Sequence, residues 1–181
     1  MNLPNKLTLA RLLLIPVFLI AASMRYQYAD YIAAAVFILG AATDGLDGYI
    51  ARKRGQVTLL GKFMDPLADK ILVSAALIAL VELGRLPGWV AVVIISREFV
   101  VTGLRAVAAA EGVVISASSL GKVKTVTQIV AIAVMFVNDL PFNLIHLPFG
   151  GIAMAVAVVF TIWSGLDYFL KTWKLLRKCG Y

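Results

Sequence analysis

Residues 44–69 read DGLDGYIARKRGQVTLLGKFMDPLAD and join two long apolar segments of the chain. Four of the ten acidic residues of the chain lie here, at the facing ends of the two segments. Asp44 and Asp47 are three residues apart, and Asp65 and Asp69 are four apart, so on helices each pair shares one face. The connection between the segments is short, which favours antiparallel helices. This stretch therefore predicts a helical hairpin in which the two aspartate pairs converge.

The chain around this hairpin is too apolar for a water-soluble domain. Hydrophobic residues make up 61% of its 181 residues, and its mean hydropathy is +0.92. Soluble domains contain roughly 45–50% apolar residues. A domain of this size leaves much of its surface exposed, so the solvent that meets this surface must be lipid.

Six apolar segments have lengths near the roughly 20 residues that cross a bilayer core. They are 7–24, 31–51, 62–83, 89–110, 122–137 and 149–170. The connections are short and contain turn-forming residues, and no long linker, internal repeat or low-complexity tract divides the chain. The sequence therefore predicts an all-α polytopic membrane protein with six transmembrane helices, forming a single domain over residues 1–181.

The positions of the basic residues predict the orientation of these helices. Most lysines and arginines lie on one side, whereas the loops of the other side carry only Arg25 and Arg85. By the positive-inside rule both termini are cytoplasmic, which agrees with an even number of spans. The net charge of +7 then reflects topology and contacts with anionic lipid headgroups rather than nucleic-acid binding. The single cysteine, Cys179, and the single histidine, His146, exclude an internal disulfide and a zinc site of paired histidines.

The depth of the four aspartates indicates a metal site. Asp44 lies roughly 10 Å from the end of its segment at helical rise. A bare aspartate at this depth costs a few kcal/mol, and four neighbouring carboxylates repel one another. Divalent cations remove both penalties, and an all-oxygen ligand set favours Mg²⁺ or Mn²⁺. Two such ions about 4 Å apart suit a phosphoryl transfer, while a structural polar network or an ion pathway is the alternative.

Small and basic residues accompany the acids. Gly45, Gly48 and Ala51 leave a bare helix face, which either admits a ligand to the backbone or packs closely against another helix. Arg52 either binds a diphosphate through two hydrogen bonds or anchors the end of the helix.

The complete pattern D-x2-D-G-x2-A-R-x8-G-x3-D-x3-D resembles the signature of the CDP-alcohol phosphotransferases. Its eight fixed positions are Asp44, Asp47, Gly48, Ala51, Arg52, Gly61, Asp65 and Asp69. Four further segments resemble the bacterial phosphatidylglycerophosphate synthases of that family: PNKLTLARLLLIPVF (4–18), SREFVVTGLR (96–105), LGKVKT (120–125) and TIWSGLDYF (161–169). The resemblance thus extends over nearly the whole chain.

The resemblance implies a homodimeric six-helix membrane enzyme that transfers a phosphate-linked group from a CDP-alcohol and releases CMP. It implies that two metal ions are bound by Asp44, Asp47, Asp65 and Asp69, and that Asp69 is also the general base for the acceptor hydroxyl. It further implies a donor site. The cytidine diphosphate would contact Asp47, Gly48, Ala51 and Arg52, and the donor headgroup would contact Asn5, Thr8 and Arg11.

A second group of basic residues suits the acceptor. Arg97 and Arg105 lie two helical turns apart in an apolar segment, where an unpaired arginine is costly. Together with Lys122 and Lys124 they are expected to bind the acceptor phosphate. The alternative for Arg97 is an internal ion pair with Glu98, and for the two lysines it is anchoring at the membrane interface.

The branch resemblance implies that glycerol 3-phosphate attacks CDP-diacylglycerol at the cytoplasmic face of the bacterial cytoplasmic membrane, giving phosphatidylglycerophosphate and CMP. Serine or an inositol phosphate as acceptor is the alternative within the same chemistry. A divalent-cation transporter is the alternative from another class. A transporter predicts acids along a route to both faces, whereas all four aspartates lie in the cytoplasmic half of their segments, which favours the enzyme.

Overall fold

The computed structural model describes residues 3–24, 26, 28–54, 59–110, 119–137 and 149–178, and the side chains of 9–24, 26, 28–43, 67–109, 120–137 and 149–173. These residues form six α-helices and no β-strand, which confirms the all-α prediction. The helices are α1 (Leu3–Ser23), α2 (Ala29–Arg54), α3 (Leu59–Glu82), α4 (Gly88–Ala110), α5 (Ser119–Phe136) and α6 (Phe149–Lys178). Each predicted segment corresponds to one helix. The helices α1 and α6 extend furthest beyond their predicted segments, because a helical backbone continues through polar residues that hydropathy does not mark.

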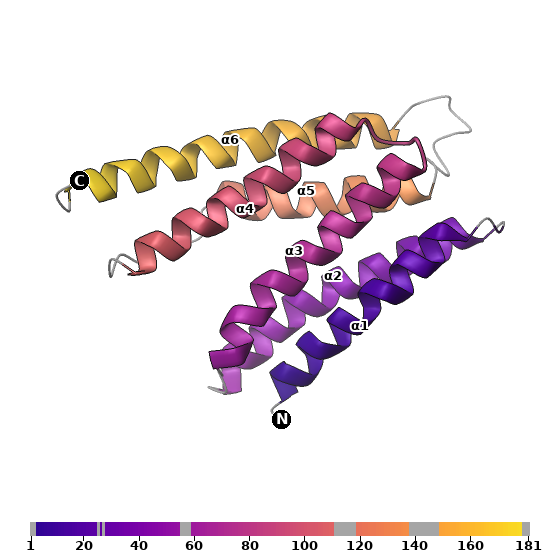
Figure 1. Ribbon diagram of the computed structural model, residues 1–181, viewed down its shortest axis with the longest axis horizontal. Helices are drawn as coiled ribbons and strands as arrows, with labels where there is room; N and C mark the ends of the chain where they lie inside the picture. The colour runs from indigo at the N-terminus through magenta and orange to yellow at the C-terminus, as the bar shows by residue number, and fades with distance from the viewer. Residues whose placement is uncertain are drawn as a thin grey trace.

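Successive helices run in alternating directions, so α1 begins and α6 ends at the same end of the bundle (Figure 1). The helices α1 and α2 pack against each other, and α6 packs against both α4 and α5. The helix α3 lies between these two groups and contacts α1, α2, α4 and α5. The second half of the carboxylate hairpin is therefore carried by the most central helix of the bundle.

Aromatic side chains hold α1, α2 and α5 together. The ring centroids of Phe18 and Phe37 are 6.2 Å apart, and those of Phe18 and Phe136 are 5.4 Å apart in an edge-to-face arrangement. All three rings are fully buried, within a core that also includes Leu77 and Ile132. Edge-to-face contacts of this kind add to the stabilisation that burial of the rings supplies.

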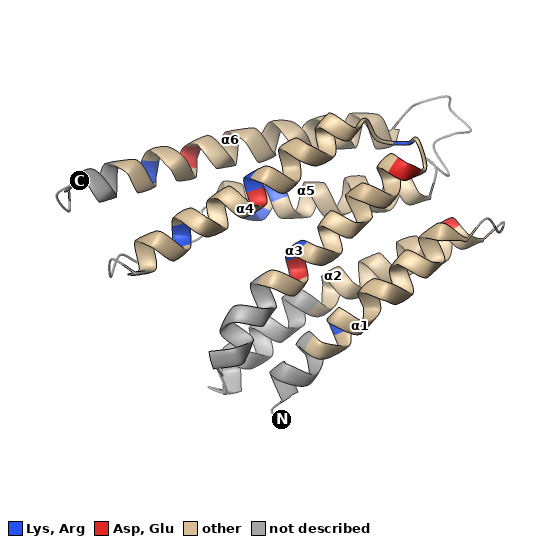
Figure 2. Ribbon diagram, viewed as in Figure 1, with Lys and Arg blue, Asp and Glu red and all other residues tan. Residues whose placement is uncertain are grey.

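Many large apolar side chains lie on the surface of the bundle in addition to those in its core. Leu13, Ile20, Trp89, Val92 and Trp163 are each more than half exposed. Buried polar side chains, in contrast, occur on α1, α5 and α6. Charged residues occupy few of the described positions along the helices (Figure 2). Large apolar patches of this kind mark surfaces that meet another apolar phase.

One helical segment among the described residues, Phe149–Trp173, is long and apolar enough to cross a membrane. Two shorter apolar helical segments, Leu9–Ser23 and Ala29–Thr43, accompany it. The prediction of six spans with cytoplasmic termini therefore stays a prediction.

A polar cluster fastens three elements at the α3–α4 turn, where Gly84 adopts a φ of 68° that favours glycine. The guanidinium of Arg85 donates to Oδ2 of Asp30 at 2.5 Å, at the beginning of α2. It also donates to the carbonyl oxygens of Met135 and Phe136 at the end of α5, at 3.3 and 3.0 Å. These contacts, called the Arg85 clamp below, satisfy carbonyl groups that a helix end leaves without an intrahelical partner.

Candidate active site

The hairpin that the sequence predicts is present in the backbone. Asp44 and Asp47 lie in α2, and Asp65 and Asp69 lie in α3, so the helical spacing within each pair is confirmed. The two helices contact each other. Of these four side chains the structure describes only that of Asp69, and the described residues contain no cluster of three metal-ligating side chains.

Several predicted positions have side chains outside the described ones. They are Asn5, Thr8, Asp44, Asp47, Gly48, Ala51, Arg52 and Asp65. Their assignment to metal and donor binding stays a prediction.

Near the aspartates, a side chain of α3 packs directly against the backbone of α2. A Cβ atom on Gly40 would stand 2.6 Å from Cδ2 of the buried Leu72, which is too short for a real contact. Gly40 lies four residues before Asp44, and Leu72 lies three residues after Asp69. The small residue at position 40 therefore leaves room for the Leu72 side chain one turn from the aspartates.

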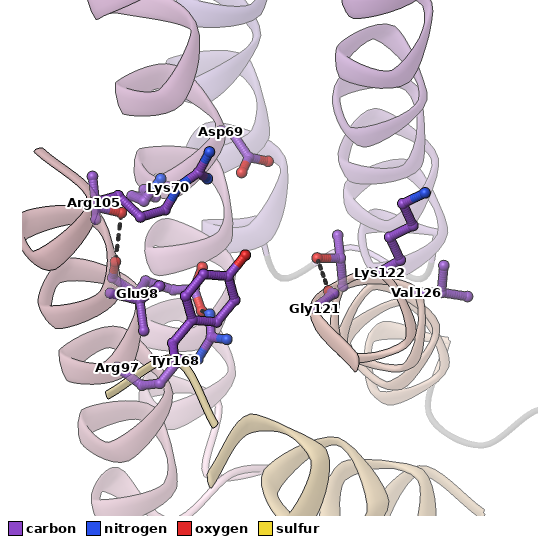
Figure 3. A pocket seen from close by; sticks show the side chains of 12 residues that line it. Asp69, Lys70, Arg97, Glu98, Arg105, Gly121, Lys122, Val126 and Tyr168 are labelled. Carbon is purple, nitrogen blue, oxygen red and sulfur yellow. Dashed lines mark hydrogen bonds and ion pairs between the residues drawn. The ribbon is translucent and has the colours of Figure 1, made fainter. Parts of the chain in front are cut away.

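Asp69 faces a cavity of about 420 Å³. This volume is within the range of small-molecule sites. Four cationic and two anionic side chains line the cavity: Lys70, Arg97, Arg105 and Lys122, with Asp69 and Glu98. Figure 3 shows Asp69, Lys70 and Arg105 on one side of the cavity and Lys122 on the other. The excess of positive charge suits an anionic ligand.

A buried ionic network connects α4, α5 and α6 at this cavity. Oε1 of Glu98 accepts from Nη1 of Arg97 at 3.0 Å and from Nζ of Lys124. Nη2 of Arg97 donates to Oγ of Ser164 at 2.8 Å. The side chains of Glu98, Arg97 and Lys124 are 15, 13 and 5% exposed. The ion pair that the sequence offered as the alternative role of Arg97 is therefore present.

The four predicted acceptor-site residues fall into two groups. Arg105 and Lys122 line the cavity, and neither forms an ion pair or side-chain hydrogen bond with another described residue, whereas Arg97 and Lys124 both bind Glu98. Lys124 is buried behind the cavity rather than in its wall. Arg11, predicted at the donor headgroup, is fully buried in α1 and is not among the residues that line this cavity.

Sequence reasoning missed the contribution of α6. Ser164 bonds Arg97, and Tyr168 lines the cavity with its ring largely buried (Figure 3). Thr161, Ser164, Tyr168 and Thr172 repeat every three or four residues along α6 and are all buried. This polar stripe on an otherwise apolar helix is the signal that could have identified an inward-facing polar face.

Residues 1–163 match the family model described as CDP-alcohol phosphatidyltransferase. The chain belongs to this family. A CDP-diacylglycerol–glycerol-3-phosphate 3-phosphatidyltransferase from Bacillus subtilis is 49% identical, over 97% of each chain. A probable phosphatidylglycerophosphate synthase from Mycobacterium tuberculosis is 44% identical, over 99% of this chain and 84% of the relative. A CDP-diacylglycerol–glycerol-3-phosphate 3-phosphatidyltransferase from Rickettsia felis is 38% identical, over 93% of each chain.

The CDP-alcohol phosphatidyltransferases are metal-dependent enzymes. The donor set of the hairpin fits this requirement, because it consists of four carboxylates on two helices that contact each other. Carboxylate oxygens are the ligands that Mg²⁺ and Mn²⁺ prefer.

Proposed function

We propose that this chain transfers the phosphatidyl group of CDP-diacylglycerol to glycerol 3-phosphate, forming phosphatidylglycerophosphate and releasing CMP. One structural observation carries the proposal. The cavity joins Asp69, the last position of the family motif, to a cluster of cationic side chains from α3, α4 and α5. The names of the relatives specify the same two substrates. A phosphorylated acceptor suits this cavity because fixed cations replace the water that its phosphate loses on entry.

In the proposed reaction, the primary hydroxyl oxygen of glycerol 3-phosphate attacks the phosphorus of the phosphatidyl group. The bond from that phosphorus to the bridging oxygen breaks, and CMP leaves with the oxygen. Asp69 accepts the hydroxyl proton, which requires the acceptor to lie within hydrogen-bond reach of its carboxylate. Arg105 and Lys122 bind the acceptor phosphate and orient the hydroxyl toward Asp69.

The donor occupies the hairpin end of the site. Asp47, Gly48, Ala51 and Arg52 bind the cytidine diphosphate, and Asn5 and Thr8 contact the headgroup. Arg11 was predicted to join them, but its side chain has no exposed surface that could contact the headgroup. Asp44, Asp47, Asp65 and Asp69 would hold two Mg²⁺ or Mn²⁺ ions, which would supply positive charge at the diphosphate.

The acceptor is tested by CMP release from purified protein and CDP-diacylglycerol with a panel of alcohols. We expect turnover with glycerol 3-phosphate and little with free glycerol or serine. Glycerol offers no charge to the cationic cavity, and serine brings an ammonium group that the cavity repels. Comparable rates with serine would assign the enzyme to a branch of the family that uses another acceptor. No CMP release with any alcohol would favour a cation transporter.

The role of Arg105 is tested by substitution. Arg105→Ala should raise the KM for glycerol 3-phosphate about 10–100-fold, since a charge-assisted pair contributes about 1.5–3 kcal/mol. The KM for CDP-diacylglycerol should change far less. Lys171→Ala is the matched control, because Lys171 is an exposed cation on α6 that pairs with Asp167. A defect confined to the lipid substrate would contradict the assignment.

The membrane arrangement belongs to the same proposal. We place six spans in the bacterial cytoplasmic membrane, with both termini and the cavity facing the cytoplasm, in a homodimer. The exposed apolar side chains and the asymmetry of basic residues support this arrangement. Cys179, the only cysteine, should react with a membrane-impermeant thiol reagent only after the cytoplasmic face is opened. Equal labelling of Cys179 in intact cells would show that the C-terminus lies outside the cell and would contradict the proposed orientation.

A further inference from the structure

A small chamber of about 20 Å³ adjoins the main cavity. It is lined by Asp69, Lys70, Val73, Glu98, Lys124, Thr125, Gln128 and Ile129. Four of these residues also line the main cavity: Asp69, Lys70, Glu98 and Thr125. The chamber is large enough for one water molecule or one hydroxyl group and too small for a phosphate. It is therefore a small extension of the main cavity, located next to Asp69, the proposed general base.

Gln128 is the unusual residue of this chamber. Its side chain is only 2% exposed, and neither its Nε2 nor its Oε1 has a hydrogen-bond partner. It lies one turn after Lys124 on α5, on the face that meets α3 and α4. A buried amide without partners is destabilising, and such groups are rare in proteins. The amide is therefore available to a group that enters the chamber.

The chemistry of an amide restricts what that group is. Gln128 offers two N–H donors and one carbonyl acceptor. A phosphate oxygen accepts only, so it would satisfy the donors and be repelled by Oε1. A hydroxyl group both donates and accepts, and it fits the volume of the chamber.

Glycerol 3-phosphate supplies such a hydroxyl in the required place. In the proposed reaction its primary hydroxyl approaches Asp69, while its phosphate is held by Arg105 and Lys122, which line the main cavity. Its secondary hydroxyl is on the carbon next to the attacking one, so it must lie close to Asp69 as well. The chamber is the polar space that adjoins Asp69 outside the main cavity wall.

We propose that Gln128 is a specificity-determining residue whose amide binds the secondary hydroxyl of the acceptor, so that the site selects a phosphorylated vicinal diol over a phosphorylated mono-alcohol. This inference rests on the proposed function. It concerns the secondary hydroxyl of the acceptor, which the cationic residues do not bind. A single trapped water molecule is the other candidate for the chamber.

The experiment crosses two acceptors with two enzymes. The acceptors are glycerol 3-phosphate and 3-hydroxypropyl phosphate, which lacks only the secondary hydroxyl. The enzymes are the wild type and Gln128→Leu, which keeps a similar volume and removes the amide. In the wild type, kcat/KM for glycerol 3-phosphate should exceed that for 3-hydroxypropyl phosphate by about tenfold or more. In Gln128→Leu this ratio should fall to about one, with the value for 3-hydroxypropyl phosphate nearly unchanged.

Two controls separate this role from a structural one. Thr172→Val removes a different buried polar group without a hydrogen-bond partner, a hydroxyl on α6 outside the chamber, and should keep the wild-type ratio. Activity with 3-hydroxypropyl phosphate itself reports whether Gln128→Leu is folded, and Gln128→Met is a second isosteric variant.

Three results would overturn the inference. Equal kcat/KM values for the two acceptors in the wild type would show that the enzyme does not recognise the secondary hydroxyl. An equal loss with both acceptors in Gln128→Leu and Gln128→Met assigns the amide to structure or to a trapped water. A wild type that turns over neither acceptor, but turns over another alcohol, contradicts the proposed function itself.

Discussion

Glu98 is the residue whose loss should show how the active site is held together. Its carboxylate binds two cations, Arg97 from the same helix and Lys124 from α5, and Arg97 in turn binds Ser164 of α6. Glu98→Gln keeps the shape of the side chain and removes its charge. Two positive charges then remain in the interior without the anion that compensated them.

The size of the effect follows from the burial of the three groups. Removing one partner of a buried ion pair destabilises a protein by about 3–5 kcal/mol, because the remaining charge is uncompensated. All three side chains here are at most 15% exposed, so the buried case applies. The glutamine carbonyl still accepts one hydrogen bond, which places the expectation near the lower limit, at about 3 kcal/mol. For a protein of this length that corresponds to a fall in Tm of roughly 6–12 °C.

The assay is thermal unfolding of the purified protein in detergent, followed by tryptophan fluorescence. Asp167→Asn is the matched control, since it makes the same carboxylate-to-amide change in an exposed pair with Lys171 at 2.7 Å. The control should lose about 0.5 kcal/mol or less, because a surface pair within one helix contributes little.

A double-mutant cycle isolates the interaction between Glu98 and Lys124. Lys124→Met removes one of the two cations, so the double variant with Glu98→Gln should be less destabilised than the sum of the single variants. The expected coupling is at least about 1 kcal/mol for residues in direct contact. If Glu98→Gln shifts the Tm no more than Asp167→Asn, the network does not stabilise the helices around the cavity, and the reasoning is wrong.

Three further predictions concern the hairpin. Asp69→Asn should reduce CMP release about 100-fold or more while CDP-diacylglycerol still binds, because asparagine cannot take the proton from the attacking hydroxyl. Near-normal turnover of this variant would show that another residue is the general base. Excess chelator should abolish CMP release, and added Mg²⁺ or Mn²⁺ should restore it, whereas turnover that persists in chelator would remove the metals from the mechanism. Gly40→Ala should destabilise the protein by about 1–3 kcal/mol and lower kcat, since the new methyl group collides with Leu72. Combining Gly40→Ala with Leu72→Ala should recover part of the kcat. An unchanged kcat in Gly40→Ala would show that the packing of α2 against α3 at this point does not affect catalysis.

The sequence predicted the helices and the hairpin because both depend on local patterns. Apolar runs of membrane length mark each helix, and the spacing of Asp44, Asp47, Asp65 and Asp69 places each pair on one helical face without reference to the rest of the chain. The ends of α1 and α6 were less well predicted, because a helix continues through polar residues while hydropathy falls.

The arrangement of the cavity depended on contacts between helices, which spacing does not reveal. Lys124 and Glu98 are 26 residues apart, so nothing local indicated that they share a bond. The sequence accordingly grouped Arg97 and Lys124 with Arg105 and Lys122, although Arg97 and Lys124 form ion pairs with the buried Glu98 and, among the described residues, Arg105 and Lys122 form none. Gln128 was overlooked for the same reason, since one glutamine in an apolar segment gives no sign of the chamber it lines.

The Arg85 clamp is a fixed point about which a tilt of α3 would displace Asp69. It fixes the start of α2, the turn after α3 and the end of α5 at one place. Asp69 lies 13 residues before the end of α3 at Glu82, so it stands roughly 20 Å from that point along the helix axis. At that lever arm a tilt of about 5° swings Asp69 through roughly 1.7 Å, and a displacement near 1 Å is enough to cost about 100-fold in rate. Asp30 and Arg85, which do not line the cavity, would thus control the alignment of Asp69, the proposed general base.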